Sequence, residues 1–321
     1  MNPVLFELWR GNVLESVHRG RYAVVAGRRV IARKGDADDV TFLRSAAKPF
    51  QAITVVETGA RDAYGLTDEE VAVVCGSHHG EDVHVRAAGS ILRKAGLKPA
   101  HLRCGVHAPI SADAQRALAR AGRKPTVLHN NCSGKHAGMV AAAKRLKAPL
   151  DRYLDPGHPL QRRNLETIAR FADVKPSSIR LGVDGCSAPT FGMPLTAIAR
   201  AFARLADPFG ADYEFDVPNA MMRHPHMVGH PCEELMKAVP LEIVGKVGAE
   251  GVYGACVMGH AVGIAVKIDD GNARALLAVV VALLGRLGLF DRTKRAALEA
   301  IVRTEQKNHA GKVVGRLRAT V

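Results

Sequence analysis

Aromatic residues are scarce in this sequence, and its positive charge is not clustered. Only 5% of the 321 residues are aromatic, and the 45 Lys and Arg residues, set against 31 acidic ones, contain no run of five. Proteins that bind single-stranded nucleic acid stack bases on several aromatic side chains inside a concentrated basic groove. We therefore expect no nucleic-acid partner, although the net charge of +14 leaves a basic polyanion-binding protein as an alternative.

Long hydrophobic runs and targeting signals are also missing. The longest apolar run, Ala275 to Leu284, is too short to cross a bilayer, and no basic segment followed by an apolar one opens the chain. The six cysteines are widely spaced, with no Cys-x-x-Cys pair. In a chain of this length without a signal peptide, such spacing favours reduced thiols over disulfides. We expect a cytoplasmic protein with no membrane partner.

The hydrophobic pattern predicts strands at both ends of the chain and helices between them. Strand-like alternation occurs near 4–9, 13–17, 22–25 and 30–32 and returns over 241–267. Helical spacing occurs near 82–95, 112–121, 134–147, 159–172, 191–205, 217–223 and 273–284, and Thr67 with Glu70 forms a capping box. Strands from both ends can pair into one antiparallel sheet flanked by helices, so we expect a single α/β domain over 1–321.

The stretch 130–139, Asn-Asn-Cys-Ser-Gly-Lys-His-Ala-Gly-Met, combines several reactive side chains. Ser133 is expected to cap a helix, which would place Cys132 at the positive end of that helix with Lys135 one turn away. Both effects favour a thiolate over a thiol. A thiolate there could bind a metal or attack carbon, whereas in an ordinary capped helix the cysteine would only be a small buried hydrophobe.

A second cysteine makes a metal site chemically reasonable. Cys186 lies in the glycine-rich turn 182–189, and two thiolates with one nitrogen suit zinc. Histidine is the usual third ligand, and His136 is close in sequence. Lys135 could bind only as a neutral amine, which costs roughly 5 kcal/mol that a divalent cation could supply. Both nitrogens remain open as the third ligand at this point.

Ser45 and Lys48 form the one Ser-x-x-Lys pattern of the chain, where a strand is expected to meet a helix. A spacing of three puts both side chains on one helical face, and a neutral lysine can then deprotonate the serine. Ser77 and Lys246-Val247-Gly248 follow in the order found in active-site-serine amide hydrolases. Because Ser-Asp-Asn and Lys-Thr-Gly are missing, β-lactam chemistry is not implied.

Taken together, these blocks resemble the asparaginase II family of rhizobial type. The matching blocks span nearly the whole chain, at 44–50, 75–81, 104–109, 129–139, 182–189, 246–252 and 267–271. The resemblance implies a fold similar to that of serine β-lactamases and serine-dependent glutaminases. It further implies hydrolysis of L-asparagine to L-aspartate and ammonia, and a homodimer. A related serine amidohydrolase acting on glutamine or a β-lactam is the enzymatic alternative.

The resemblance also implies roles for individual residues. Catalysis would use two Ser–Lys pairs, Ser45 with Lys48 and Ser77 with Lys246. Zinc would be bound by Cys132, Lys135 and Cys186. The substrate-binding residues that we predict are Arg44, Asn130, His136, Asp184 and Cys232. Ser45 is the preferred nucleophile because a helix start favours an alkoxide, and the opposite assignment of Ser45 and Ser77 stays open.

Overall fold

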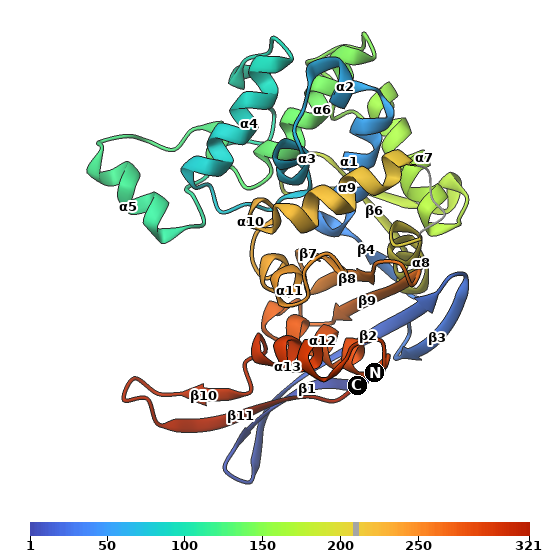
Figure 1. Cartoon of the computed structure of the whole chain (residues 1–321), viewed down its shortest axis with the longest axis vertical. Coiled ribbons are helices and arrows are strands. Elements are labelled where there is room, and N and C mark those ends of the chain that lie inside the picture. The colour runs from blue at the N-terminus through green and yellow to red at the C-terminus, as the bar shows by residue number, and fades with distance from the viewer. Residues whose placement is uncertain (208–211) are drawn as a thin grey trace. The chain divides into compact units, whose positions relative to one another are not determined.

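The structure, a computed structural model, describes residues 1–207 and 212–321. Within that part the chain divides into two compact units. The sheet unit consists of Met1–Ala46, 193–207 and Glu234–Val321, and the helical unit consists of Ala47–Gly192 and 212–233. Figure 1 shows the elements of both in chain order. That the chain forms a single asparaginase II-like domain stays a prediction.

An antiparallel sheet built from both ends of the sequence forms the sheet unit (Figure 1). Its strands follow the order β10 (Glu305–Lys307), β11 (Val313–Ala319), β1 (Val4–Arg10), β2 (Val13–Ala26), β9 (Val262–Ile268), β8 (Val252–Val257) and β7 (Ile243–Gly248), and β3 (Arg29–Lys34) also pairs with β2. Phe6 pairs with Ala319, so the first strand lies beside the last. The predicted antiparallel sheet from N- and C-terminal strands is therefore confirmed.

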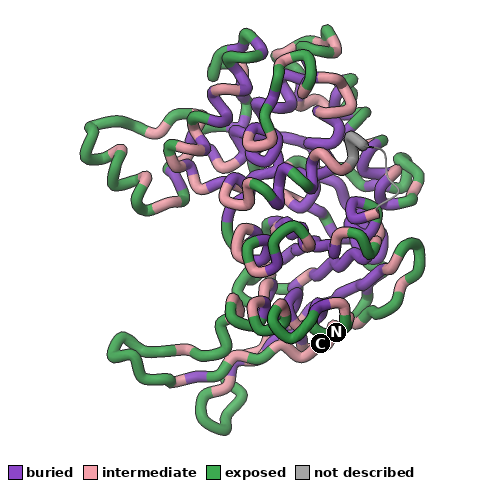
Figure 2. Tube along the Cα trace, in the orientation of Figure 1, coloured by how far each residue is buried: buried purple, intermediate pink, exposed green. Residues whose placement is uncertain are grey.

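Helices cover this sheet because glycines let them approach it closely. α8 (Leu195–Leu205) packs on β2, β8 and β9, and α12 (Leu276–Arg286) packs on β8, β9 and β11. A Cβ on Gly254 would lie 1.9 Å from the Phe202 ring, and one on Gly263 would lie 2.1 Å from the Ala199 oxygen. Both glycines thus leave room for α8, and strands β7 to β9 are almost entirely buried (Figure 2).

The remaining elements of the sheet unit are short. They are β4 (Val40–Phe42), η1 (Arg44–Ala47), η5 (Ala273–Ala275) and α13 (Arg292–Ala300). The predicted helix over 191–205 begins only at Leu195, because Pro189–Pro194 form the strand β6 and Pro194 takes the cap position. α13, β10 and β11 were not predicted from the sequence.

The helical unit is organised around α6 (Ser133–Arg145), from whose start the candidate site is built. Its other elements are α1 (Lys48–Glu57), α2 (Ala60–Tyr64), α3 (Asp68–Cys75), α4 (Asp82–Lys94), η2 (Pro99–His101), α5 (Ala112–Arg120), η3 (Val127–His129), α7 (Pro159–Ala172), η4 (Pro176–Ser178), β5 (Arg180–Val183), α9 (Asp212–Arg223) and α10 (Pro225–Val228). α11 (Cys232–Ala238) follows. The capping box of Thr67 and Glu70 is confirmed at the start of α3.

α6 contacts α1, α3, α4 and α7, and its residues 133–143 are all buried. Two glycines allow this packing. A Cβ on Gly134 would lie 2.2 Å from the Val73 oxygen, and one on Gly138 would lie 2.7 Å from a methyl of Val74. α3 and α6 therefore touch almost backbone to backbone at the first turn of α6.

Gly134→Ala is expected to destabilise the protein by about 1–3 kcal/mol, because the new methyl group meets a backbone oxygen that cannot rotate away. Gly285→Ala in α12 is the matched control, since no atom lies within 4 Å of a Cβ at that position. The control should be neutral or up to about 1 kcal/mol more stable, owing to the higher helix propensity of alanine. Urea unfolding of both variants measures the difference, and equal stabilities would contradict the proposed contact.

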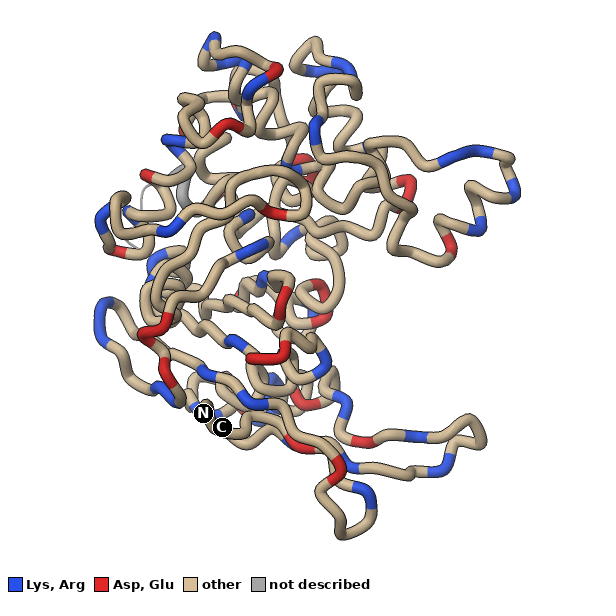
Figure 3. The backbone as a smooth tube through the Cα atoms, turned by 180° about the vertical axis from the view of Figure 1, so that it is seen from behind, with Lys and Arg blue, Asp and Glu red and all other residues tan. Residues whose placement is uncertain are grey.

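No helix in the described part of the chain is both long and apolar enough for a membrane span. All six cysteines, at 75, 104, 132, 186, 232 and 256, are buried and free of disulfides, as the sequence predicts. Lys and Arg are spread along the chain in both units (Figure 3).

Candidate active site

A cluster of two thiols and two lysine amines lies at the start of α6 in the helical unit. The Nζ of Lys135 donates a hydrogen bond to the Sγ of Cys186 over 2.9 Å. Cys132 shares a side-chain hydrogen bond with Cys186 and receives another from Lys48. Cys132, Cys186, Lys135 and Lys48 are each at most 6% exposed. The structure thus brings together the three predicted zinc ligands and one predicted catalytic lysine.

Charge within this cluster is shared between sulfur and nitrogen. The hydrogen bond with Cys186, aided by the nearby Lys48 and Lys135 side chains, holds the pKa of Cys132 well below the ordinary value of a thiol, against the effect of burial. The same hydrogen bond, together with burial, raises the pKa of Cys186. Burial lowers the pKa of Lys135, but the two sulfur neighbours outweigh it and raise that pKa overall.

The donor set fits a zinc ion. Zinc takes thiolate and nitrogen ligands in tetrahedral sites, and here two sulfurs and one amine already contact one another. Among residues 1–207 and 212–321, no group of three His, Cys, Asp or Glu side chains is arranged to hold a metal. The Lys135 amine already contacts Cys186, and its assignment as the third ligand stays a prediction.

The start of α6 differs from the prediction in one respect. The helix begins at Ser133 with Cys132 in the cap position, so the prediction of Ser133 as N-cap is wrong. The Ser133 hydroxyl instead donates to the Leu128 oxygen over 2.8 Å, while Asn130 Oδ1 accepts the Cys132 N–H over 2.8 Å. Because Asn130 Nδ2 also donates to the Cys104 oxygen, this side chain fixes the loop that carries Cys132.

Ser77 lies in the loop after α3 and is half-buried. Its backbone N–H donates to the Val228 oxygen over 3.0 Å. Its Oγ accepts a hydrogen bond of 3.0 Å from the Nζ of Lys48, which also donates to the Gly76 oxygen. Lys48 is only 1% exposed. The structure therefore joins a serine and a lysine that the sequence had assigned to different pairs.

Ser45 and Lys246 belong to the sheet unit, together with Arg44. A Cβ on Gly248 would lie 2.5 Å from the Leu43 oxygen, so the end of β7 packs directly on the backbone that leads into Ser45. Lys246, two residues earlier, points to the same face of the strand as Gly248. Lys246 is fully buried, whereas Ser45 is half-buried. Arg44 adopts a φ of 50° and lies 3.9 Å from Glu250.

The other predicted substrate-binding residues lie in the helical unit. Asp184 is half-buried and lies, like Cys186, in the turn between β5 and β6. Its Oδ1 accepts the Gly185 N–H. Cys232 is fully buried at the first residue of α11. His136 is also fully buried, with its Nδ1 2.6 Å from the Tyr153 hydroxyl. Substrate binding by these residues stays a prediction.

His78 and Tyr153 support the site and were not found from the sequence. Nδ1 of His78 accepts the Gly80 N–H over 3.1 Å, so its Nε2–H can donate to Ser133 Oγ over 2.9 Å. Burial lowers the pKa of His78, which keeps the ring neutral. His78 thus ties the Ser77 loop to the start of α6. The position of His78 next to Ser77, within the block 75–81, was a signal in the sequence that could have revealed this role. No comparable signal in the sequence surrounds Tyr153.

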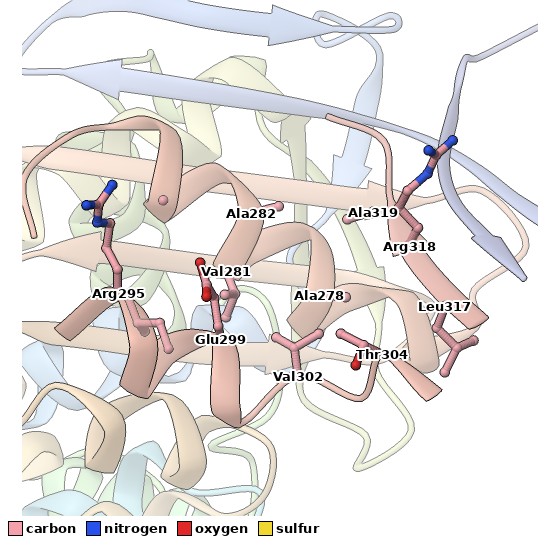
Figure 4. A pocket seen from close by; sticks show the side chains of 12 residues that line it. Ala278, Val281, Ala282, Arg295, Glu299, Val302, Thr304, Leu317, Arg318 and Ala319 are labelled. Carbon is pink, nitrogen blue, oxygen red and sulfur yellow. The ribbon is translucent and has the colours of Figure 1, made fainter. Parts of the chain in front are cut away.

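A separate cavity of about 370 Å³ lies in the sheet unit. Figure 4 shows it between α12, α13 and β11, lined mainly by apolar side chains such as Val281, Val302 and Leu317. Arg295, Glu299 and Arg318 are the charged residues at its edge. None of the predicted site residues lines it, so it is not the candidate active site.

Comparisons with known proteins identify the family. The model of the L-asparaginase II family matches residues 6–319, and the chain belongs to that family. A search among curated proteins found no matching sequence.

Solved structures with a similar fold were also found. One is described as Mglu in its tris and glutamate form, with 18% identity, a TM-score of 0.47 and coverage of 91% of this chain and 64% of that chain. Another is a β-lactamase from Mycobacterium bovis, with 16% identity, a TM-score of 0.39 and coverage of 88% and 95%. The present chain thus spans just under two thirds of the length of the Mglu chain. With TM-scores below 0.5, these likenesses do not enter the functional argument.

Proposed function

We propose that the protein is an L-asparaginase that hydrolyses L-asparagine to L-aspartate and ammonia by serine–lysine acyl transfer. The observation that carries the proposal is the 3.0 Å hydrogen bond from the buried Lys48 amine to the half-buried Ser77 hydroxyl. A lysine held against a serine inside a protein is the arrangement that activates a hydroxyl without histidine. In a member of the L-asparaginase II family, this points to hydrolysis of a side-chain amide.

The proposed reaction has two halves. Ser45 Oγ attacks the amide carbon of asparagine. Its proton passes through the Ser77 hydroxyl, which acts as a relay, to the neutral amine of Lys48. The carbon–nitrogen bond then breaks, and ammonia leaves with the relayed proton. In the second half, water attacks the acyl ester, its proton is taken by the same lysine, and aspartate is released with the serine restored.

Charged residues support recognition of the amino-acid end of the substrate. The Asp184 carboxylate is suited to the α-ammonium group, and the Arg44 guanidinium is suited to the α-carboxylate. Asn130 and Cys232 complete the proposed binding set together with His136. The family resemblance also leads us to propose a homodimer as the working form.

Ammonia release from asparagine tests the proposal directly. We expect turnover of asparagine well above that of glutamine, and none of a chromogenic β-lactam. Glutamine turnover exceeding that of asparagine would instead assign a glutaminase. No ammonia from either amide would reject the proposal, and binding to duplex DNA with a steep salt dependence would then favour a polyanion-binding protein.

We propose zinc as the resident metal, held by Cys132, Lys135 and Cys186. When bound there, zinc would supply a positive centre that orients the substrate, while the serine supplies the attack. Cys132 and Cys186 would bind it as thiolates and Lys135 as a neutral amine, so the protons that these groups still carry would be released on binding.

Metal analysis of the purified protein is expected to give about one zinc per chain, because two thiolates and one amine form a three-residue zinc site. Cys132→Ser and Cys186→Ser should each lose most of that zinc, whereas Cys256→Ala, which removes a buried thiol in the sheet unit, should retain it. Full zinc in both serine variants would disprove the ligand assignment. If the ion only orients substrate, its removal should raise KM more than it lowers kcat.

A further inference from the structure

His136 occupies a fully enclosed position in the first turns of α6. Its ring is 0% exposed and meets the Tyr153 ring edge-on, at 5.7 Å between centroids and an interplanar angle of 81°. Its Nδ1 lies 2.6 Å from the Tyr153 hydroxyl oxygen. Tyr153 is likewise 0% exposed. Each hydrogen on these two side chains therefore needs a partner inside the protein.

Counting hydrogens fixes the tautomer of the ring. The Tyr153 oxygen accepts the backbone N–H of Arg103 over 2.9 Å. Its own hydrogen has one acceptor among the described residues, Nδ1 of His136. Tyrosine therefore donates to Nδ1, and the single proton of the neutral imidazole lies on Nε2.

Nε2 of His136 has no hydrogen-bond partner in the described part of the protein. Leaving such a donor unpaired costs about 1–3 kcal/mol, so a group that the polypeptide does not supply is expected to accept its hydrogen. His136 directly follows Lys135 on α6, and the Lys135 amine donates to Cys186 over 2.9 Å. His136 is thus one residue along the chain from the cluster at the start of α6.

We propose that Tyr153 is a positioning residue that locks His136 in the Nε2–H tautomer, so that Nε2–H donates a hydrogen bond to an oxygen of the amide substrate. This inference rests on the proposed function and adds a residue to it. Tyr153 acts through His136 and does not touch the substrate itself.

The backbone of Tyr153 is fixed as firmly as its side chain. The Tyr153 carbonyl oxygen accepts a hydrogen bond of 2.7 Å from Gln161 Nε2, and Gln161 Oε1 accepts one of 3.0 Å from Asn164 Nδ2. Gln161 and Asn164 are buried on one face of α7. Because α7 holds the Tyr153 carbonyl and the Arg103 N–H holds its hydroxyl, Tyr153 has little freedom to follow the imidazole, so the imidazole must adapt to it.

Two measurements test the inference. Nitrogen NMR of protein labelled at histidine should show His136 with a bare Nδ1 and a protonated Nε2, and Tyr153→Phe should remove that preference. In the same variant KM for asparagine should rise about tenfold with kcat near the wild-type value, since the lost contact is one oriented hydrogen bond. Tyr22→Phe alters a buried tyrosine of the sheet unit and should change neither quantity.

Two substitutions of His136, one that keeps an N–H donor and one that removes it, form a matched pair. His136→Gln retains an N–H donor of similar reach and should keep a lower KM than His136→Leu, which has none. A wild-type ring protonated on Nδ1, or a Tyr153→Phe variant with unchanged tautomer and KM, would overturn the inference. If the protein fails to hydrolyse asparagine, the proposed function fails, and the tautomer measurement still decides whether Tyr153 sets the proton on His136.

Discussion

Lys48→Met is expected to lower kcat for asparagine by about 10²–10⁴, the usual contribution of a positioned proton-transfer group. The Lys48 amine donates to Ser77 Oγ and to the Gly76 oxygen and also contacts Cys132. Methionine fills nearly the same buried volume but cannot accept or donate the proton. KM should change little, because the amine serves the reacting hydroxyl and not the bound substrate.

The matched control is Lys144→Met. Lys144 lies on α6 and donates to a backbone oxygen, that of Ala95. Unlike Lys48, it makes no hydrogen bond with a serine hydroxyl in the described part of the chain. Steady-state kinetics of the two variants, with circular dichroism to confirm folding, gives the comparison. Equal activity of Lys48→Met and wild type would exclude Lys48 from catalysis, and a similar loss in Lys144→Met would point to a general effect of removing charge.

Ser45→Ala is expected to remove turnover almost completely and to prevent trapping of a covalent adduct. Removing the nucleophile of an acyl-transfer enzyme costs on the order of 10⁶ in kcat. Ser45 precedes α1 in a short 3-10 turn, whose backbone is packed against the end of the strand that carries Lys246. In Ser77→Ala the loss of the relay should slow both half-reactions, yet an acylating substrate analogue should still form the adduct.

Rates alone would not separate the two serines, because members of one catalytic unit often cost nearly the same when removed singly. Mass spectrometry of the protein after treatment with the analogue is therefore the deciding measurement. An adduct on Ser77 in the Ser45→Ala protein, with none in Ser77→Ala, would exchange the two roles. Ser178→Ala, which removes an exposed hydroxyl that donates to the Lys175 oxygen, should leave both adduct and turnover intact.

Elements with strong local features were predicted from the sequence. The capping box at Thr67 and the helix over 159–172 agree with the structure, because caps and apolar spacing act over a few residues. β11 was missed because it alternates exposed charged residues, such as Arg316 and Arg318, with half-buried ones and carries little apolar periodicity. Its pairing with β1 is a long-range contact that no local pattern contains.

For the candidate site, too, local chemistry could be predicted from the sequence and long-range contacts could not. The chemistry of Cys132, Lys135 and Cys186 suggested a cluster before any geometry was known, and the structure brings these side chains together. The contact between Lys48 and Ser77 depends on how α1 and α3 pack, and spacing along the chain could not reveal it. Tyr153 lies in a loop, and only its contact with His136 motivates the role that we propose for it.

The pairing of the first strand with the last sets an order of events during synthesis. β2 needs β9, since Gly20 pairs with Ile268, and β1 needs β11. While the ribosome is still producing the middle of the chain, the N-terminal hairpin has open edges that could pair with another nascent chain. Residues 47–192, whose helices pack mostly on one another, can assemble meanwhile. The sheet is completed only after β11 has left the exit tunnel, so its early strands are the part of this protein most in need of a chaperone.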